Sequence, residues 1–182
     1  MEIVACIGKS HEKVIGYSRQ DLANAITGLK PTDIVFTYLS REDFEDGRYG
    51  PEVSILLNRP EFRQKIRFAG AGNEGRITAS EVKTNAEAVV RKNIVDMIYS
   101  TIYAYLEGYW KDQETVNSEV TDALFRARRL LVSQIEGVEG DKKWESAHEK
   151  ILSNIGRMKL GSNPVLVAPV ESAFWFKDNL LN

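Results

Sequence analysis

The chain has 182 residues, of which 43% are hydrophobic and 27% charged, and its formal net charge is −2. This length and composition suit a single globular domain whose core is large enough to fold without disulfides or metal ions. The near-neutral charge excludes a surface built mainly to attract phosphate backbones, so we do not expect nucleic acid as a partner.

Metal-ligand residues are scarce. The single cysteine, Cys6, excludes an internal disulfide and a cysteine-rich zinc site. His11 and His148 are the two histidines, which is too few to favour an imidazole-based metal centre. We therefore expect neither a metal nor a cofactor.

The sequence shows neither the pattern of a signal peptide nor that of a membrane-spanning helix. The N-terminal residues lack the basic leader and apolar stretch of a signal peptide. The longest apolar zone contains Asp96 and Glu107 and is too short for a membrane span. We expect a protein without a membrane partner, in the cytoplasm or in a particle assembled there.

Predicted strands and helices alternate over the first eighty residues. Ser18 and Asp21 resemble a capping box and predict a helix over residues 18–29. Residues 40–50 form an acidic turn region, and Asn58 can cap a short helix. The apolar runs that are strands or strand candidates are residues 3–7, 14–17, 33–39, 53–57 and 67–69.

Residues 85–111 form the longest predicted helix. Its apolar residues cover roughly two thirds of the circumference, far more than an ordinary surface stripe. The continuous polar strip that remains consists of Asn93, Asp96, Ser100, Glu107 and Lys111. We expect a helix of this kind to be covered on two sides and to form the central rod of the fold.

Two more helices are predicted after it, over residues 118–136 and 141–158, separated by Gly137 and Gly140. Short connections between consecutive helices favour antiparallel neighbours, which predicts an antiparallel three-helix layer in the C-terminal half. A last strand is predicted at 165–168, followed by an amphipathic helix over 171–181.

This order of elements predicts a mixed α/β fold with a small mixed sheet of about five strands. We expect one domain over residues 1–182. Within it, residues 1–80 and 162–182 form the sheet, and residues 84–160 form the helical layer.

Two glycine-containing loops are candidate ligand sites. Gly8, Lys9, Ser10 and His11 follow the first predicted strand, at the end where open α/β sheets bind ligands. Lys9 would neutralise a small anionic ligand, while Ser10 and His11 could hydrogen-bond to it or act as acid and base. The alternative is a solvated turn.

The second loop contains Gly70, Gly72 and Gly75, with the glycine spacing of a dinucleotide-binding turn. Glu74 would place a negative charge in that cradle, and the next helix begins too late to meet a pyrophosphate. A flexible glycine loop is the favoured interpretation.

Aromatic residues at two places predict a protein interface. One helix cannot bury three consecutive aromatic rings on one side, so at least one ring near the C-terminus must meet another surface. Tyrosine and tryptophan are enriched at subunit contacts. The predicted interface residues are Tyr109, Trp110, Phe174, Trp175 and Phe176.

These patterns leave two hypotheses. The first is a non-enzymatic assembly protein that forms a symmetric homo-oligomer or part of a larger particle, such as a virion connector or tail component. The second is a Rossmann-like nucleotide- or phosphate-binding domain, sensor or enzyme, that uses the loop after the first strand.

Overall fold

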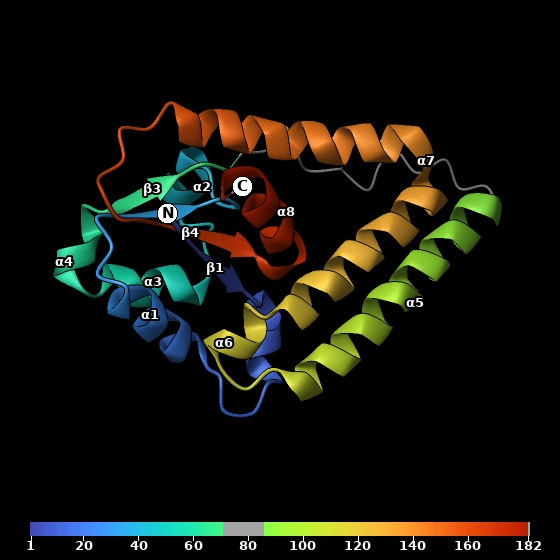
Figure 1. Ribbon diagram of the computed structural model, residues 1–182, viewed down its shortest axis with the longest axis horizontal. Helices are drawn as coiled ribbons and strands as arrows, with labels where there is room; N and C mark the ends of the chain where they lie inside the picture. The colour runs from blue at the N-terminus through green and yellow to red at the C-terminus, as the bar shows by residue number, and fades with distance from the viewer. Residues whose placement is uncertain (71–85, 182) are drawn as a thin grey trace.

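The computed structural model describes residues 1–70 and 86–181. Four strands form one sheet in the order β1–β4–β2–β3, and each neighbouring pair is parallel (Figure 1). The strands are β1 (Glu2–Cys6), β2 (Asp33–Phe36), β3 (Ile66–Phe68) and β4 (Pro164–Pro169). The mixed α/β class is confirmed. The predicted mixed sheet of about five strands is not confirmed, because the described part of the chain holds four strands and all of them are parallel.

Two apolar runs that were strand candidates have other structures. Residues 14–17 follow the short 3₁₀ helix η1 (Gly8–Glu12) as a turn, although Val14 and Tyr17 are buried. Residues 53–57 belong to helix α3 (Pro51–Leu57), because Pro51 fits the first turn of a helix and has no amide hydrogen for a sheet.

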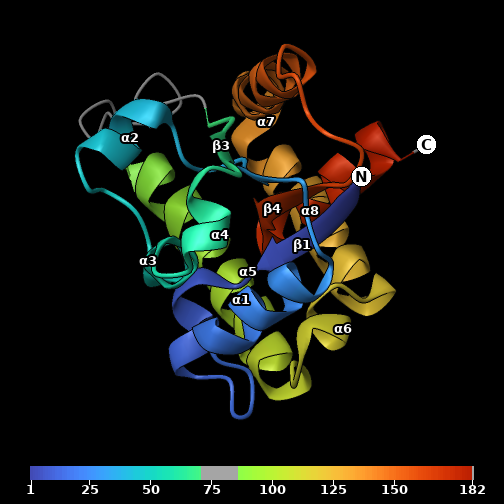
Figure 2. The same cartoon turned by 90° about the vertical axis from the view of Figure 1, so that its left-hand side faces the viewer.

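The sheet is covered on both faces, as a parallel sheet requires. Figure 2 shows α1 (Arg19–Gly28), α3 and α4 (Pro60–Arg63) on one side of it and α8 (Val170–Leu180) on the other. The capping box of Ser18 and Asp21 at the start of α1 is confirmed. The acidic region 40–50 contains a short helix, α2 (Arg41–Glu45), which the sequence did not predict.

The long helices do not form the predicted three-helix layer. Helix α5 (Ala86–Tyr109) runs beside the first half of α7 (Glu119–Gly156), with the short α6 (Gln113–Val116) between them in the chain. Helix α7 then bends sharply at Gly137, where φ is 72° and ψ is −172°, a backbone conformation open essentially to glycine alone. The second half crosses back over the rest of the molecule (Figure 1).

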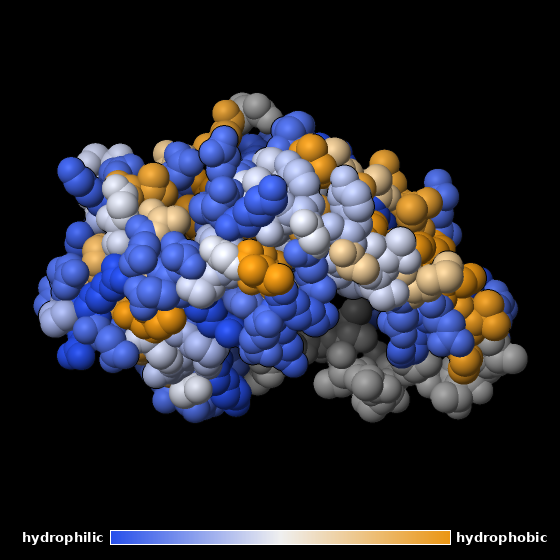
Figure 3. Space-filling view, turned by 90° about the horizontal axis from the view of Figure 1, so that it is seen from below, coloured by the Kyte–Doolittle hydropathy of each residue, from blue (hydrophilic) through white to orange (hydrophobic). Residues whose placement is uncertain are grey.

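The position of α5 is also a correction. It is not a central rod but an outer helix, and several of its apolar side chains face away from the domain. Figure 3 shows hydrophobic surface along this side of the molecule. The exposed apolar residues of α5 are Val89, Val90, Ile94, Met97, Tyr99 and Tyr105.

The outer edge of β1 is covered by side-chain amides rather than by another strand. Ala5 N donates to Asn117 Oδ1 at 2.8 Å, and Asn117 Nδ2 donates to Ile3 O at 2.9 Å. Gln113 Nε2 donates to Ala5 O at 3.3 Å. Asn117 therefore supplies the hydrogen bonds that a fifth strand would supply, and it closes this edge to pairing with other chains.

The substitution Asn117→Ala tests this contribution. It leaves the Ala5 amide and the Ile3 carbonyl without partners in a half-buried setting, so we expect a loss of about 1–3 kcal/mol in the free energy of unfolding. Urea denaturation followed by circular dichroism measures it. Asn179→Ala is the control, because Asn179 is exposed and bonds only within its own helix, to Trp175 O. Equal stability of the two variants would contradict the role given to Asn117.

Candidate functional site

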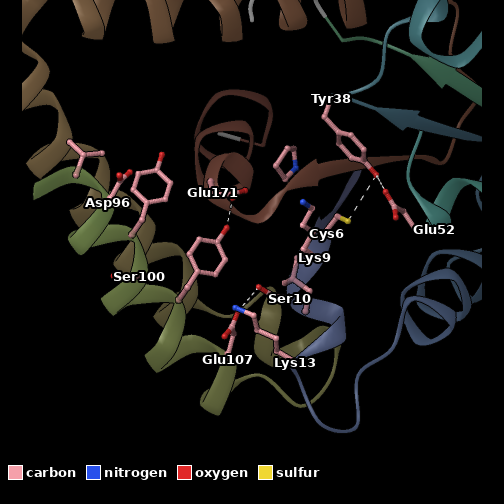
Figure 4. A pocket seen from close by; sticks show the side chains of 16 residues that line it. Cys6, Lys9, Ser10, Lys13, Tyr38, Glu52, Asp96, Ser100, Glu107 and Glu171 are labelled. Atoms are coloured by element: carbon pink, nitrogen blue, oxygen red, sulfur yellow. Dashed lines mark hydrogen bonds and ion pairs between the residues drawn. The ribbon is translucent and has the colours of Figure 1, made fainter. Parts of the chain in front are cut away.

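A cavity of about 850 Å³ opens at the carboxyl ends of the central strands (Figure 4). One wall is the end of β1 and the loop that follows it, together with Tyr38 after β2 and Pro169 at the end of β4. The opposite wall is α5. Open parallel sheets bind ligands at this edge because the loops that follow the strands converge there.

The loop after β1 lines this cavity with three of its four predicted residues, Gly8, Lys9 and Ser10. His11 does not take part. Its ring is buried against Tyr17, with Nδ1 3.3 Å from Tyr17 O, and desolvation lowers its pKa. His11 is therefore a packing residue and not the predicted acid or base.

The polar strip of α5 faces the cavity. Asp96, Ser100 and Glu107 from this strip line it. Ser10 Oγ donates to Glu107 Oε1 at 2.7 Å, and Lys13 Nζ lies 3.2 Å from the same oxygen. These contacts tie α5 to the loop after β1 and neutralise Lys13.

Glu52 is the most buried carboxylate of the cavity, with 5% of its surface exposed. Its Oε1 accepts a hydrogen bond from the Tyr38 hydroxyl at 2.9 Å, and its Oε2 lies 3.9 Å from Arg19 Nε. Burial is the main cause that raises the pKa of Tyr38, so its hydroxyl stays a donor. The Glu52 carboxylate is thus held in place by a neutral donor and faces the cavity.

Glycine at position 50 makes room for this carboxylate. The side chain of Glu52 folds back over the first turn of α3, and a Cβ on Gly50 would lie 2.2 Å from Glu52 Oε1. Glu52 is not among the residues predicted from the sequence, because it precedes an apolar run that resembles a strand. The signal that could have revealed it is Gly50-Pro51, which marks the start of a helix with an acidic residue in its first turn.

A second tyrosine–glutamate pair lies on the other side of the cavity. The Tyr103 hydroxyl of α5 donates to Glu171 Oε1 of α8. Burial, followed by the charge of Glu171, raises the pKa of Tyr103, so this hydroxyl also stays protonated. Figure 4 places Glu171 toward α5 and Glu52 on the opposite side, with Cys6 and Lys9 between them.

The charge of the lining limits the ligand. Four carboxylates, those of Glu52, Asp96, Glu107 and Glu171, face the cavity together with two ammonium groups. A polyphosphate would be repelled from such a lining. Carboxylates accept hydrogen bonds from hydroxyl and amino groups, and tyrosine rings offer faces for stacking. The arrangement suits a small ligand that is rich in hydrogen-bond donors.

Cys6 lines the cavity in a setting that disfavours its thiolate. Burial, and then the charge of Glu52, raises the pKa of its thiol to about 12. The reactive form of a cysteine is the thiolate, which this setting suppresses.

The second glycine loop lies mostly outside the described residues. Gly72 and Gly75 are not among them. Gly70 follows two residues after the end of β3, and a Cβ there would lie 2.6 Å from the Leu39 carbonyl carbon, so glycine is needed for close packing of two chain segments. Gly70 does not line the cavity.

The predicted interface residues are covered to a large extent by their own chain. Trp110, Phe174 and Phe176 are buried, and Trp110 Nε1 donates to Thr121 Oγ1 at 3.0 Å. Tyr109 and Trp175 are half-buried. A neighbouring chain is therefore not needed to cover the three buried rings. The aromatic series near the C-terminus instead packs α8 against the second half of α7 through Trp144 and His148.

Within the residues described, His, Cys, Asp and Glu side chains form no group of three or more that could hold a metal ion. None of the helices in residues 1–70 and 86–181 combines the length and the apolar character needed to cross a bilayer.

Comparisons of the chain with protein-family models, with curated proteins and with solved structures gave no match.

The reactivity of Cys6 tests the environment of the cavity floor. Because the thiol is buried and its pKa is raised to about 12, we expect native protein to react very slowly with a thiol reagent such as DTNB at pH 8. After denaturation in guanidinium, one thiol per chain should react at once. Rapid reaction of the native protein would show that the floor is open and the thiol ionised.

Proposed function

We propose that this chain binds the nucleoside part of a nucleotide-class ligand in the cavity at the carboxyl edge of the sheet, with Glu52 as the group that acts on it. The observation that carries this proposal is the buried Glu52 carboxylate, fixed by Tyr38 and facing a cavity. The proposal develops the nucleotide-binding hypothesis and uses the loop Gly8–Ser10 as one wall.

The chemistry of a nucleoside fits the lining. Its ribose hydroxyls and exocyclic amino groups donate hydrogen bonds, which the carboxylates of Glu52 and Glu171 can accept. Its base has a flat face, which the rings of Tyr99 and Tyr103 on α5 can cover. A carboxylate held by one neutral donor keeps lone pairs for a ligand, so Glu52 is the candidate general base of the site.

Burial of Glu52 gives its charge a greater effect on a ligand than an exposed carboxylate would have, because screening by water is weak there. Arg19 lies too far from Oε2 for a hydrogen bond, at 3.9 Å. This oxygen is therefore available to a ligand, whereas Glu107 is already engaged by Ser10 and Lys13.

A thermal-shift panel tests this function with adenosine, guanosine, cytidine and uridine as probes. A ligand at 100 times its dissociation constant stabilises the folded state by about 2.7 kcal/mol. We expect at least one nucleoside to raise the melting temperature of the wild-type chain. Glu52→Gln, which keeps the shape and can still accept from Tyr38, should abolish that shift. Glu61→Gln, an exposed position on α4, is the control and should keep it.

If no nucleoside raises the melting temperature, or if the Glu52→Gln variant responds like the wild type, the proposed function is wrong.

We also propose that the chain forms a homo-oligomer through the outer face of α5. The assembly hypothesis is thereby kept, but the proposed contact is now the outer face of α5 and not the aromatic residues predicted from the sequence. Val90, Ile94, Met97 and Tyr105 recur at helical spacing on one face, and their exposed fractions are 55%, 39%, 60% and 61%. Exposed apolar patches of this kind typically mark interaction sites, and a second copy offers the same apolar face.

Light scattering coupled to size exclusion tests the assembly. We expect the wild-type chain to have a mass that is a multiple of 20.5 kDa, and Met97→Glu to reduce it to that of a single chain because a charge would be buried in the contact. Ile15→Glu is the matched control, since Ile15 is 93% exposed in a loop away from α5. A single-chain mass for the wild type at micromolar concentrations would contradict the assembly.

A further inference from the structure

A second hollow, of about 1190 Å³, lies between α5 and the two halves of α7, around the bend at Gly137. Its charge is opposite to that of the first cavity. Seven arginine and lysine side chains line it together with two glutamates, Glu136 and Glu139. This is a local concentration of positive charge on a chain whose net charge is −2. We call it the basic hollow.

Arg128 is the central observation in the basic hollow. Its side chain is buried, with 6% of the residue exposed. Its Nε and Nη1 atoms have no hydrogen-bond partner among the described residues. Unpaired donors on a buried guanidinium group are unfavourable unless something accepts hydrogen bonds from them.

Aromatic rings hold this guanidinium in one orientation. Its carbon lies 3.9 Å from the centre of the Tyr99 ring and 5.0 Å from that of Phe125. Both rings are within cation–π distance of the guanidinium, so contacts with ring faces restrict its position. A planar group fixed in this way suits an acceptor with two oxygens, such as a phosphate.

The neighbouring arginines do not offer the same opportunity. Arg129 pairs with Asp141 and lies over Trp144, and Arg91 pairs with Glu87. Lys142 and Lys143 are exposed at the rim of the hollow, where they can attract an anion. The basic hollow thus combines a buried guanidinium with two unpaired nitrogen atoms inside and exposed positive charges at its entrance.

The two hollows are neighbours. Tyr99 and Val95 of α5 line both of them. The Tyr99 ring has Arg128 against it on the basic side and belongs to the wall of the carboxylate cavity on the other. A ligand that passes Tyr99 would therefore meet carboxylates at one end and Arg128 at the other.

We infer that the basic hollow is a phosphate site and that Arg128 binds the phosphate groups of the ligand whose nucleoside part occupies the carboxylate cavity. The assignment to a nucleotide rests on the proposed function, whereas the anion site rests on Arg128 and the surrounding charge. The substrate class that fits both hollows is a nucleoside di- or triphosphate, or another ligand that joins a donor-rich group to phosphates.

Isothermal titration calorimetry with inorganic pyrophosphate tests the phosphate site alone. We expect binding to the wild-type chain, and a loss of roughly tenfold or more in affinity for Arg128→Met, which keeps the apolar stem but removes the donors. Arg126→Met is the matched control, because Arg126 lies on the same helix but pairs with Asp178 outside the hollow. Its affinity should equal that of the wild type.

Two further variants keep the test decisive if Arg128→Met does not fold. The double variant Lys142→Gln, Lys143→Gln alters the exposed rim and should weaken pyrophosphate binding, while Lys159→Gln, which lies outside the hollow, should not. The absence of pyrophosphate binding, or unchanged affinity after loss of Arg128 or of the rim lysines, would overturn the phosphate site.

Adenosine and ADP separate this inference from the proposed function. If both hold, ADP binds more tightly than adenosine. Glu52→Gln then weakens the binding of adenosine and of ADP but leaves the affinity for pyrophosphate unchanged. Arg128→Met weakens the binding of pyrophosphate and of ADP but leaves the affinity for adenosine unchanged. Pyrophosphate binding without any nucleoside or nucleotide binding would refute the proposed function and leave the anion site standing.

Discussion

The placement of β4 between β1 and β2 is the constraint on which the rest of the structure depends. This strand comes from the far end of the chain, yet it pairs with both β1 and β2 and is buried except at its last residue. The pairing brings Cys6 opposite Pro169, so that the loop after β1 and the first turn of α8 meet at one edge. Glu171 can face Lys9 and Ser10 across one cavity only because the C-terminal strand occupies the centre of the sheet.

Helix α5 has an unusual arrangement of polar and apolar residues, because its polar strip lines a cavity. In an ordinary surface helix, the polar residues face water and the apolar stripe faces the core. Here the polar strip with Asp96, Ser100 and Glu107 faces inward toward a lining of loop residues, and apolar residues such as Met97 face outward. The same helix therefore contributes to a polar site on one side and to an uncovered apolar surface on the other, which is why both function hypotheses draw on it.

Local signals were sufficient to predict several elements from the sequence, including the capping box at Ser18, the buried strands and the mixed α/β class. The loop Gly8–Ser10 could be predicted as part of the cavity because the position after the first strand of a parallel sheet is fixed by topology. Glu52 could not, because its role depends on Tyr38 and on the missing side chain of Gly50, and neither contact leaves a periodic pattern. The bend of α7 was visible as Gly137, but not its direction, which the packing of Trp144 and His148 on α8 stabilises.

The two hollows differ in charge, although Val95 and Tyr99 line both of them. Like charges within each hollow repel one another, and an ion pair between Lys92 and Asp96 joins the two linings. Arg128 is not part of that ion pair; its guanidinium carbon lies 3.9 Å from the centre of the Tyr99 ring, and Tyr99 lines both hollows. Lys142 and Lys143 follow the bend at Gly137 and line the basic hollow, whereas Glu52 and Glu171 line the carboxylate cavity. The ligand that we propose for the two hollows is therefore extended, with hydrogen-bond donors at one end and phosphates at the other.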